Sequence, residues 1–465
     1  MLRDAGASSQ GPRTRLGCRA GVVVPCTANG SHVAAWPVRD TRRGPPHRYL
    51  PFITEDNHTR VFGEHDARTL EQLGTVAQRA EKVALMADGH PGYVMPIGGV
   101  AAYRNQVSIV GVGFDIACGN AALKTDLTLE SLGFTPEEQQ QTLQRIADAI
   151  QATISFGVGR KNRSDDAPVD HPLFESPAWD ALHPRYRQGL REKARTQLGT
   201  VGSGNHYVDV FADEEGVLWV GVHFGSRGLG HTVASGFLAL SQGKAWSDRA
   251  PEREVLLDLE SPLGHDYWQL MRLAGEYAYA GREWVARKVA ELLGGVEVDL
   301  VHNHHNFAWE EEHDGETLIV VRKGATPAFP GQRGFIGGSM GDNAVIVRGA
   351  DIADDPEGVE LQRSGLYSTV HGAGRVMSRS AAMGRINRRT GEVLSPDLVT
   401  SQMMDGWVRE KQVVLRGDGL DEAPQVYRRL PDVLAAQGKT IEVEHTLRPL
   451  VVVMAGANDF DPYKD

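Results

Sequence analysis

The order of helical and extended patterns along the chain most narrowly limits its fold. Apolar residues at three- and four-residue spacing predict amphipathic helices over residues 67–86, 135–154 and 266–293. Short apolar runs bounded by Gly, Asp or Arg predict strands over residues 107–112, 217–222, 317–321, 345–347 and 450–453. These elements do not follow the strict strand–helix–strand alternation of a doubly wound sheet. The order therefore favours an α+β fold with mixed or antiparallel sheets and flanking helices.

Local signals sharpen two of these boundaries. Thr135 is a suitable N-cap and Pro136 a suitable first helical residue, so the second helix is expected to begin there. Residues 88–100 contain too much Gly and Pro for a helix and lead into the strand candidate at 107–112.

Composition indicates a globular chain. Hydrophobic residues make up 41% and charged residues 23% of the 465 residues, which is ordinary for globular proteins. No run approaches the roughly 18 apolar residues that a spanning helix needs, so no membrane segment is expected. Residues 49–465 are predicted to form one catalytic domain, because no convincing linker or repeat divides them.

Residues 1–48 differ from the rest. They contain eight Arg, no Lys and two acidic residues, are rich in Gly, Pro and Ala, and show no sustained periodicity. We expect a disordered N-terminal extension, with a transit peptide as the alternative. The chain has only three cysteines, Cys18, Cys26 and Cys118, which favours a reducing compartment such as the cytoplasm.

The charge of the chain does not favour RNA binding over the whole surface. Residues 49–465 carry 41 basic and 58 acidic side chains, a formal charge of −17 against −11 for the full chain. Phosphate binding would therefore depend on local basic patches. The two candidate patches are Arg185, Arg187, Arg191, Lys193 and Arg195, and Arg375, Arg379, Arg385, Arg388 and Arg389. For either run alone, a solvated helix face is the favoured interpretation.

Several histidines lie beside Gly, Asn or Asp in loops between strand candidates. The segments are residues 111–119 with Asp115 and Cys118, 202–209 with His206, 222–231 with His223, 301–306 with His302, His304 and His305, and 368–375 with His371. Glycines there would let backbone N–H groups approach a phosphate while imidazoles bind a metal. Taken singly, Cys118 is compatible with a structural core cysteine and each His with a packed loop residue.

The run of histidines at 302–305 has a defined geometry if the chain is extended. Side chains two residues apart share a face, so His302 and His304 should point one way and His305 the other. Spacing alone does not choose the ligand. One Asp, one Cys and several His form a set suited to Mn²⁺, Fe²⁺, Co²⁺ or Zn²⁺, and the lack of further Cys favours a catalytic over a structural metal.

Taken in order, the segments GVGFDIACG, GTVGSGNHYVDV, HFGSRGLGH, HHNF, RKGATPA, GGSMGDN and HGAGR resemble the RtcB family of RNA ligases over about residues 50–456. The resemblance implies joining of RNA 3′-phosphate or 2′,3′-cyclic phosphate ends to 5′-hydroxyl ends, with GTP and two Mn²⁺. It implies one metal on Asp115, Cys118 and His206, the other on Cys118, His223 and His305, and guanylation of His371.

The resemblance also implies a guanylate pocket. Its residues would be Asn205, His206, Tyr207, Val208, Asp209, His305, Asn306, Gly337, Gly338, Ser339, Met340, Ala344, His371, Gly372, Ala373, Gly374 and Met454. Two positions depart from the family pattern. Asp209 stands where Glu is common, and Met454 stands where many members have a Lys, for which Lys464 is a candidate substitute.

These departures keep a second function open, a two-metal phosphoesterase or nuclease that acts on RNA ends without efficient guanylylation. A third reading is a non-catalytic protein that binds RNA ends. The intact candidate ligands and the intact HGAGR segment argue against pure binding, which needs neither.

Overall fold

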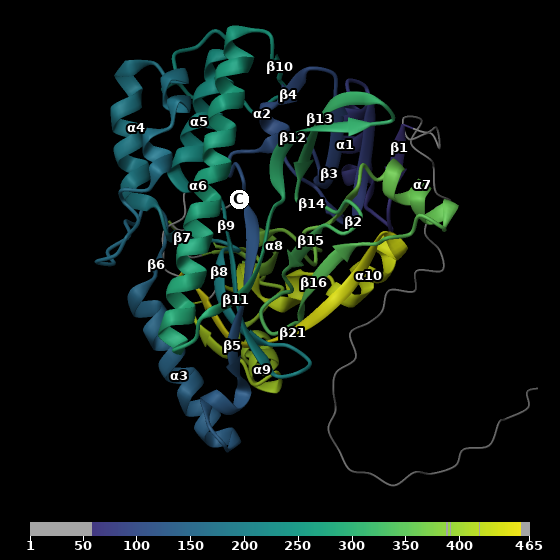
Figure 1. The fold of residues 1–465 in the computed structure, drawn as a ribbon. Helices are drawn as coiled ribbons and strands as arrows, with labels where there is room; N and C mark the ends of the chain where they lie inside the picture. The colour runs from purple at the N-terminus through teal and green to yellow at the C-terminus, as the bar shows by residue number, and fades with distance from the viewer. Residues whose placement is uncertain (1–57, 387–388, 391, 418, 457–465) are drawn as a thin grey trace, which may run out of the picture. The chain divides into compact units, whose positions relative to one another are not determined.

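Two β-sheets with helices packed on them make up the part of the chain that the computed structural model describes, residues 58–386, 389–390, 392–417 and 419–456 (Figure 1). The five-stranded sheet has the order β1 (Thr59–Val61), β2 (Lys82–His90), β3 (Ile97–Tyr103), β13 (Glu316–Lys323) and β12 (Asn306–His313). All its pairs are antiparallel except β1 with β2.

The second sheet has eight strands. Its order is β11 (Glu297–His304), β5 (Gly119–Thr128), β9 (Val217–Phe224), β8 (Tyr207–Ala212), β21 (Ile441–Met454), β16 (Ala344–Gly349) and β15 (Arg333–Ile336), with β20 (Val414–Arg416) beside β21. Only β20 runs parallel to its neighbour. The first half of β21 pairs with β16 and its second half with β8. The expected α+β class with mostly antiparallel sheets is confirmed.

Four two-stranded ladders complete the strands. They are β4 (Gln106–Ser108) with β10 (Leu256–Asp258), β6 (Ser155–Phe156) with β7 (Thr200–Gly202), β14 (Ala325–Pro327) with β17 (Ser368–Val370), and β18 (Arg385–Ile386) with β19 (Val393–Ser395).

The helices vary from one turn to nearly nine. The α-helices are α1 (Ala67–Ala77), α2 (Ile109–Val112), α3 (Pro136–Thr153), α4 (Pro184–Gln197), α5 (Arg227–Leu240), α6 (Pro262–Leu293), α7 (Pro356–Ser364), α8 (Arg379–Met383), α9 (Ser401–Glu410) and α10 (Leu430–Gln437). Short 3₁₀ turns span Leu129–Leu132, Pro172–Glu175, Pro177–Ala181, Leu420–Glu422, Pro424–Val426 and Gly438–Thr440. None of the helices in the described ranges is long and apolar enough to cross a membrane.

The long helix α6 packs in two hydrophobic cores. Its C-terminal half packs with α3 on one face of the eight-stranded sheet, where Leu123 and Val210 alternate with residues of the opposite face. Its N-terminal half packs with α4, α5 and the five-stranded sheet through residues such as Leu270 and Tyr277. One rigid helix therefore fixes where the loops at the ends of β5 and β9 lie.

The edge strand β15 packs over the other face of the eight-stranded sheet. The rings of Phe211 and Phe335 meet edge to face at 5.9 Å. Asn120 Nδ2 donates to the carbonyl of Phe335 at 2.9 Å, and Phe335 N–H donates to Asn303 Oδ1 at 2.9 Å. These bonds join β15 to β5 and β11, so the sheet curls over a small apolar core.

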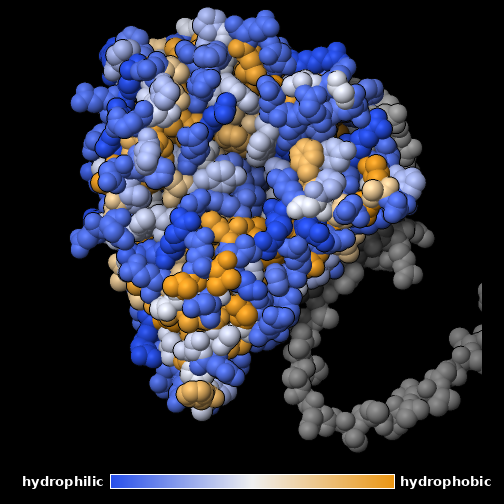
Figure 2. All heavy atoms as spheres, viewed as in Figure 1, coloured by the Kyte–Doolittle hydropathy of each residue, from blue (hydrophilic) through white to orange (hydrophobic). Residues whose placement is uncertain are grey.

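The distribution of polar and apolar side chains on the surface is that of a globular protein, as the composition predicts. The face seen in Figure 2 is mostly hydrophilic, with hydrophobic side chains gathered in limited patches.

Several predicted elements are confirmed. Thr135 caps α3, since its hydroxyl accepts from Glu138 N–H while the Glu138 carboxylate accepts from Thr135 N–H. Helix α6 begins at Pro262, four residues before the predicted start, because Ser261 supplies the cap. The strands predicted at 217–222, 317–321, 345–347 and 450–453 all exist and are longer than expected.

Two predicted elements are wrong in part. The helix predicted over 67–86 ends at Ala77, and strand β2 begins at Lys82. Residues 83–89 of β2 are all buried. A continuous apolar run of this kind fits a buried strand as well as a helix. The strand predicted over 107–112 ends at Ser108, because the Ser108 hydroxyl accepts from Gly111 N–H and caps α2.

Candidate functional site

The strand register brings the candidate metal ligands together. Strand β5 begins at Gly119, directly after Cys118, and lies between β9 and β11. Gly119 pairs with Phe224 on one side and with His304 on the other. His223 and His305 are the neighbours of those partners, so three segments far apart in sequence meet beside Cys118.

The five side chains form two groups that share the thiol. Asp115, Cys118 and His206 form one group, and Cys118, His223 and His305 the other, with ligand atoms within 4.8 Å of one another in each. Cys118 Sγ lies 3.6 Å from His206 Nε2 and 3.3 Å from His223 Nε2. His206 Nε2 is 3.1 Å from Asp115 Oδ2, and the Nε2 atoms of His223 and His305 are 3.4 Å apart.

Backbone carbonyls set the tautomers of two of these histidines. His206 Nδ1 lies 2.9 Å from the carbonyl of Val201, and His223 Nδ1 lies 2.9 Å from that of Asn205. With the proton on Nδ1, each ring donates to its carbonyl and offers the Nε2 lone pair to a metal ion. Arg227 approaches His206 Nδ1 at 3.1 Å, but a guanidinium cannot accept that proton, so the carbonyl is the partner.

Burial and charge set the protonation of the cluster. Burial lowers the pKa of His223 to about 3 and that of His305 well below its usual value, so both rings are neutral. Burial opposes ionisation of Asp115, but His206 and Arg227 outweigh it and lower the pKa to about 2. Burial and Asp115 raise the pKa of the Cys118 thiol. A bound cation would reverse that last effect.

This donor set fits divalent metal ions. It combines a carboxylate, a thiol and neutral imidazoles, and His305 Nδ1 is buried with no hydrogen-bond partner in the described part of the chain. Two three-ligand groups leave positions on each ion for substrate oxygens.

His371 lies beside the cluster and is held by a buried carboxylate. Its ring is 4.9 Å from that of His305, and its Nδ1 is 2.6 Å from Asp88 Oδ2. The same oxygen accepts the backbone N–H of His371 at 3.0 Å and of Gly372 at 3.3 Å. Burial opposes ionisation of Asp88, but His371 lowers its pKa overall. Ionised Asp88 can only accept, so Nδ1–H donates and Nε2 keeps its lone pair.

Glycines allow the proposed guanylate segments to approach one another. A Cβ at Gly337 would lie 2.3 Å from the Tyr207 hydroxyl, and one at Gly374 would lie 2.2 Å from the carbonyl of Asp88. Gly374 also has φ +72°, a conformation that favours glycine. Ser339 Oγ donates to Asp342 at 2.9 Å. A Cβ at Gly372 would lie 3.5 Å from the carbonyl of Gly337, so the two glycine segments lie beside each other, with Gly337 against Tyr207.

Other members of the predicted pocket have different surroundings. The side chains of Val208 and Ala344 belong to hydrophobic cores, so only their backbone could meet a nucleotide. Asp209 is buried, its Oδ1 has no partner among described residues, and burial raises its pKa. Met454 packs in the apolar cluster that includes Met340 and Tyr207. Lys464, the candidate substitute, lies outside the described residues.

The remaining residues of the predicted pocket contribute mainly their backbone groups or short side-chain contacts. They are Asn205, Asn306 and Ala373. Asn306 Oδ1 accepts the N–H of Gly324 at 2.8 Å, and Asn306 N–H donates to the carbonyl of Cys118. Ala373 is buried between His371 and Gly374. Asn306 therefore ties the end of β13 to the metal-ligand loop.

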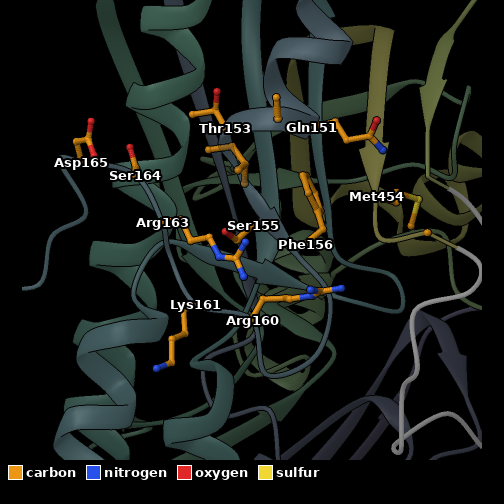
Figure 3. A pocket seen from close by; sticks show the side chains of 13 residues that line it. Gln151, Thr153, Ser155, Phe156, Arg160, Lys161, Arg163, Ser164, Asp165 and Met454 are labelled. Atoms are coloured by element: carbon orange, nitrogen blue, oxygen red, sulfur yellow. The ribbon is translucent and has the colours of Figure 1, made fainter.

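A pocket of about 500 Å³ opens where β6, the end of α3 and the end of β21 meet (Figure 3). Phe156 and Met454 contribute apolar wall, and Arg160, Lys161 and Arg163 contribute positive charge. Met454 pairs through its backbone with Tyr207, whose ring is 5.4 Å from that of His223. Met454 thus connects one wall of the pocket to His223 through Tyr207, and none of the candidate metal ligands lines the pocket.

Several arginines of the two basic runs are ion-paired in the part of the chain that the structure describes. On α4, Arg187 pairs with Asp180, while Arg191 and Arg195 pair with Glu175, which supports a solvated helix face. In the second run, Arg375 and Arg379 pair with Glu422. The Arg385 side chain and Arg388 lie outside the described residues.

Three residues that the structure places at the site have no role predicted from the sequence. Asp88 lies in a Gly- and Pro-rich segment whose motif was evident, but its partner is 283 residues away. Arg227 lies within the 222–231 segment of His223, and its guanidinium lies against Gly202. Arg282 lies in the apolar pattern of α6, and only the side chains around it reveal it as a buried cation.

The curled sheet, the shared-thiol cluster and the carboxylate-held histidine together define an α+β protein with a candidate two-metal centre beside a candidate nucleophile. Comparison with protein families places it more closely. The model of the family described as tRNA-splicing ligase RtcB matches residues 69–455, and the chain belongs to this family.

Curated relatives agree along most of both sequences. The RNA-splicing ligase RtcB of Escherichia coli K12 is 30% identical over 416 residues, covering 84% of this chain and 94% of the relative. The tRNA-splicing ligase RtcB of Thermococcus kodakarensis is 30% identical, covering 79% and 86%. That of Archaeoglobus fulgidus is 31% identical, covering 75% and 82%.

Proposed function

We propose that this chain is an RNA ligase that joins a 3′-phosphate or 2′,3′-cyclic phosphate end to a 5′-hydroxyl end, using GTP and two Mn²⁺ ions. The observation that carries the proposal is His371, fixed by Asp88 at 2.6 Å with its ring 4.9 Å from that of His305. The names of the relatives, RNA-splicing and tRNA-splicing ligases, support the same reaction class.

Two groups of side chains would hold the metals. Asp115, Cys118 and His206 would bind one ion and Cys118, His223 and His305 the other, with Cys118 common to both. When bound, the ions supply positive charge that neutralises phosphate oxygens during transfer.

His371 would be the nucleophile. Nδ1–H donates to Asp88, so Nε2 attacks the α-phosphorus of GTP, an N–P bond forms, and the bond to the pyrophosphate oxygen breaks. The imidazole gains positive charge as that bond forms. The ionised Asp88 carboxylate stabilises this charge without taking the proton.

The later steps need no further protein nucleophile. An oxygen of the RNA 3′-phosphate attacks the phosphorus on His371, the N–P bond breaks, and GMP passes to the RNA end. The 5′-hydroxyl then attacks the 3′-phosphate and GMP leaves with the electron pair of the broken P–O bond. A cyclic phosphate would first be opened by water.

The site around Tyr207 would receive the guanylate. Residues 337–340 and 371–374 would surround the bound guanylate. Buried Asp209 offers an oxygen with no partner among the described residues. The strand leading to the RNA end would lie in the pocket of Figure 3, where Arg160, Lys161 and Arg163 offset the acidic character of the chain. The scarcity of cysteine fits a cytoplasmic setting.

Asp209 and Met454 favour one alternative, a two-metal phosphoesterase or nuclease without efficient guanylylation. Met454 places no positive group in the cluster where it packs. The alternative predicts cleavage or dephosphorylation of RNA ends without a covalent GMP adduct.

Incubation with α-labelled GTP and Mn²⁺, followed by a denaturing gel, separates the two functions. Ligase function predicts a labelled band that is lost in His371→Ala, while that variant keeps its Mn²⁺. His371→Ala should still join an RNA carrying a preformed 3′-guanylate, because the last step uses no protein nucleophile. Label that persists in His371→Ala would place the nucleophile elsewhere, and lost Mn²⁺ would make His371 a metal ligand.

A further inference from the structure

Arg282 on α6 is a buried cation without an anionic partner. Its side chain has no exposed surface, and no carboxylate is ion-paired with it within the ranges that the structure describes. Burial lowers the pKa of Arg282 to about 10, so the guanidinium stays charged at neutral pH. A buried charge is tolerated only where hydrogen bonds replace its hydration, so its bonds identify what it stabilises.

The guanidinium donates to four acceptors. Two are backbone carbonyls, those of Ala117 at 2.9 Å and Phe224 at 2.6 Å. Two are imidazole nitrogens, His302 Nε2 and His304 Nδ1, each at 2.9 Å. Since arginine has no acceptor, both rings must present lone pairs to it. This confirms that His302 and His304 share a face.

Three of the four acceptors directly adjoin a proposed metal ligand. Ala117 precedes Cys118, Phe224 follows His223, and His304 precedes His305. These three ligands make up the second metal group. One guanidinium therefore connects every segment that contributes to that group.

Among these segments, the one that contains Ala117 has an unfavourable backbone conformation that hydrogen bonds must hold in place. Ala117 has φ +60°, a left-handed conformation that is unfavourable for a residue other than glycine. Its carbonyl accepts from Arg282, and its N–H donates to the carbonyl of Asn306 at 2.7 Å. Both backbone groups of Ala117 are thus held, which fixes the direction of the Cys118 side chain.

Tyr279 restrains the same assembly from the helix side. Its ring stacks on His304 at 3.8 Å and meets His302 edge to face at 4.1 Å. The guanidinium lies 5.4 Å from the Tyr279 ring. Helix α6 thus presents a matched pair of side chains to the two histidines that do not face the candidate metal centre.

We infer that Arg282 is a positioning residue for the metal centre. It holds the segments of Cys118, His223 and His305 in the geometry that receives the second ion, and it places a buried positive charge against the backbone carbonyl that precedes Cys118. The inference rests on the proposed metal ligands but not on guanylylation of His371.

Metal binding by the full-length chain tests this inference. We expect Arg282→Met to fold, judged by its thermal transition, and to bind Mn²⁺ about 10- to 100-fold more weakly in calorimetry, the range typical of outer-shell changes. Co²⁺ added to the metal-free chain should give a weaker thiolate-to-cobalt absorption band. Arg282→Lys keeps the charge but not the planar fork, so its Mn²⁺ affinity should be intermediate.

Arg322→Met is the matched control. Arg322 is equally buried, but it bonds Glu311, Ser368 and the carbonyl of Leu366 and touches no ligand segment. It should lose stability while keeping wild-type metal affinity and the cobalt band.

Two results would overturn the inference. One is a folded Arg282→Met or Arg282→Lys that binds two ions with wild-type affinity and band. The other is an Arg322→Met control that loses metal as strongly as Arg282→Met, which would reduce the effect to general destabilisation. If Cys118→Ala also kept its metals, the proposed ligand set itself would be wrong.

Discussion

At the scale of single residues, the site depends on buried groups that fix protons on neighbouring histidines. Asp88 and the carbonyls of Val201 and Asn205 each accept a hydrogen bond from an Nδ1–H group, so three imidazoles present Nε2. Two of these nitrogens face the thiol of Cys118, and the third belongs to the proposed nucleophile. The chemistry of each ring is therefore decided by a partner that does not itself react.

Replacing Asp88 with Asn tests that division of roles. The amide oxygen can still accept from Nδ1–H, but the negative charge that stabilises the imidazole during attack is lost. We expect adduct formation with labelled GTP to slow by about 10²- to 10⁴-fold. Mn²⁺ content should not change, because Asp88 belongs to neither candidate metal group. A variant with unchanged labelling rate would leave Asp88 a structural role only.

Replacing Cys118 with Ala removes the one ligand that both groups share. We expect Mn²⁺ affinity to fall at both sites, by more than the ~100-fold typical of outer-shell changes, and ligation to be lost. Inductively coupled plasma measurement of bound Mn²⁺ checks the stoichiometry. Thr125→Ala is a suitable control, since Thr125 is also buried and on β5, but its hydroxyl donates to the carbonyl of Leu218, and neither residue belongs to a candidate metal group. Unchanged stoichiometry in Cys118→Ala would contradict a bridging thiolate.

The sequence identified the candidate ligands better than their partners. Metal ligands come from few residue types, and a His or Cys among glycines is conspicuous. A supporting residue such as Arg282 sits in a helical pattern that looks purely structural, and its four acceptors lie in three distant segments. Such contacts exist only after the sheets pair.

At the scale of elements, helix patterns with caps and most buried apolar strands were predictable, but the buried strand β2 was not. The Thr135 cap and Pro136 are local signals that no tertiary contact overrides. Strand β2 has no alternation, because seven of its nine residues are buried, and its apolar run continued the pattern of α1. Pairing with β3 in the five-stranded sheet, which the sequence does not reveal, makes these residues a strand.

The loop between β6 and α4 gives a prediction at this scale. Replacing Lys161 and Arg163 together by Ala should raise the RNA concentration needed for half-maximal ligation and lower the salt slope of RNA binding by about 1 to 2. Labelling of His371 by GTP should stay at the wild-type rate. Arg191→Ala, whose side chain is ion-paired with Glu175 on α4, should change neither quantity. A similar loss in the control would mean a general effect of positive charge.

At the scale of the whole molecule, the candidate site belongs to residues that lie after position 87. Every proposed ligand, the nucleophile and its carboxylate fall between Asp88 and Met454. The predicted extension at 1–48 lies outside the described residues.

Deleting residues 1–48 should therefore leave ligation and Mn²⁺ affinity unchanged. Gel-based ligation of 3′-phosphate and 5′-hydroxyl oligonucleotides by the shortened and full-length chains measures this. A shortened chain that folds but does not ligate would assign a function to the segment.

The position of β21 has a consequence for how this protein is made. Residues 441–454 form an inner strand of the eight-stranded sheet, between β8 and β16, yet a ribosome synthesises them after every other strand. Until they leave the exit tunnel, β8 and β16 expose unpaired edges that can associate with other chains. The nascent chain therefore carries an incomplete sheet through nearly its whole synthesis, and the eight-stranded sheet closes only once these residues have been made.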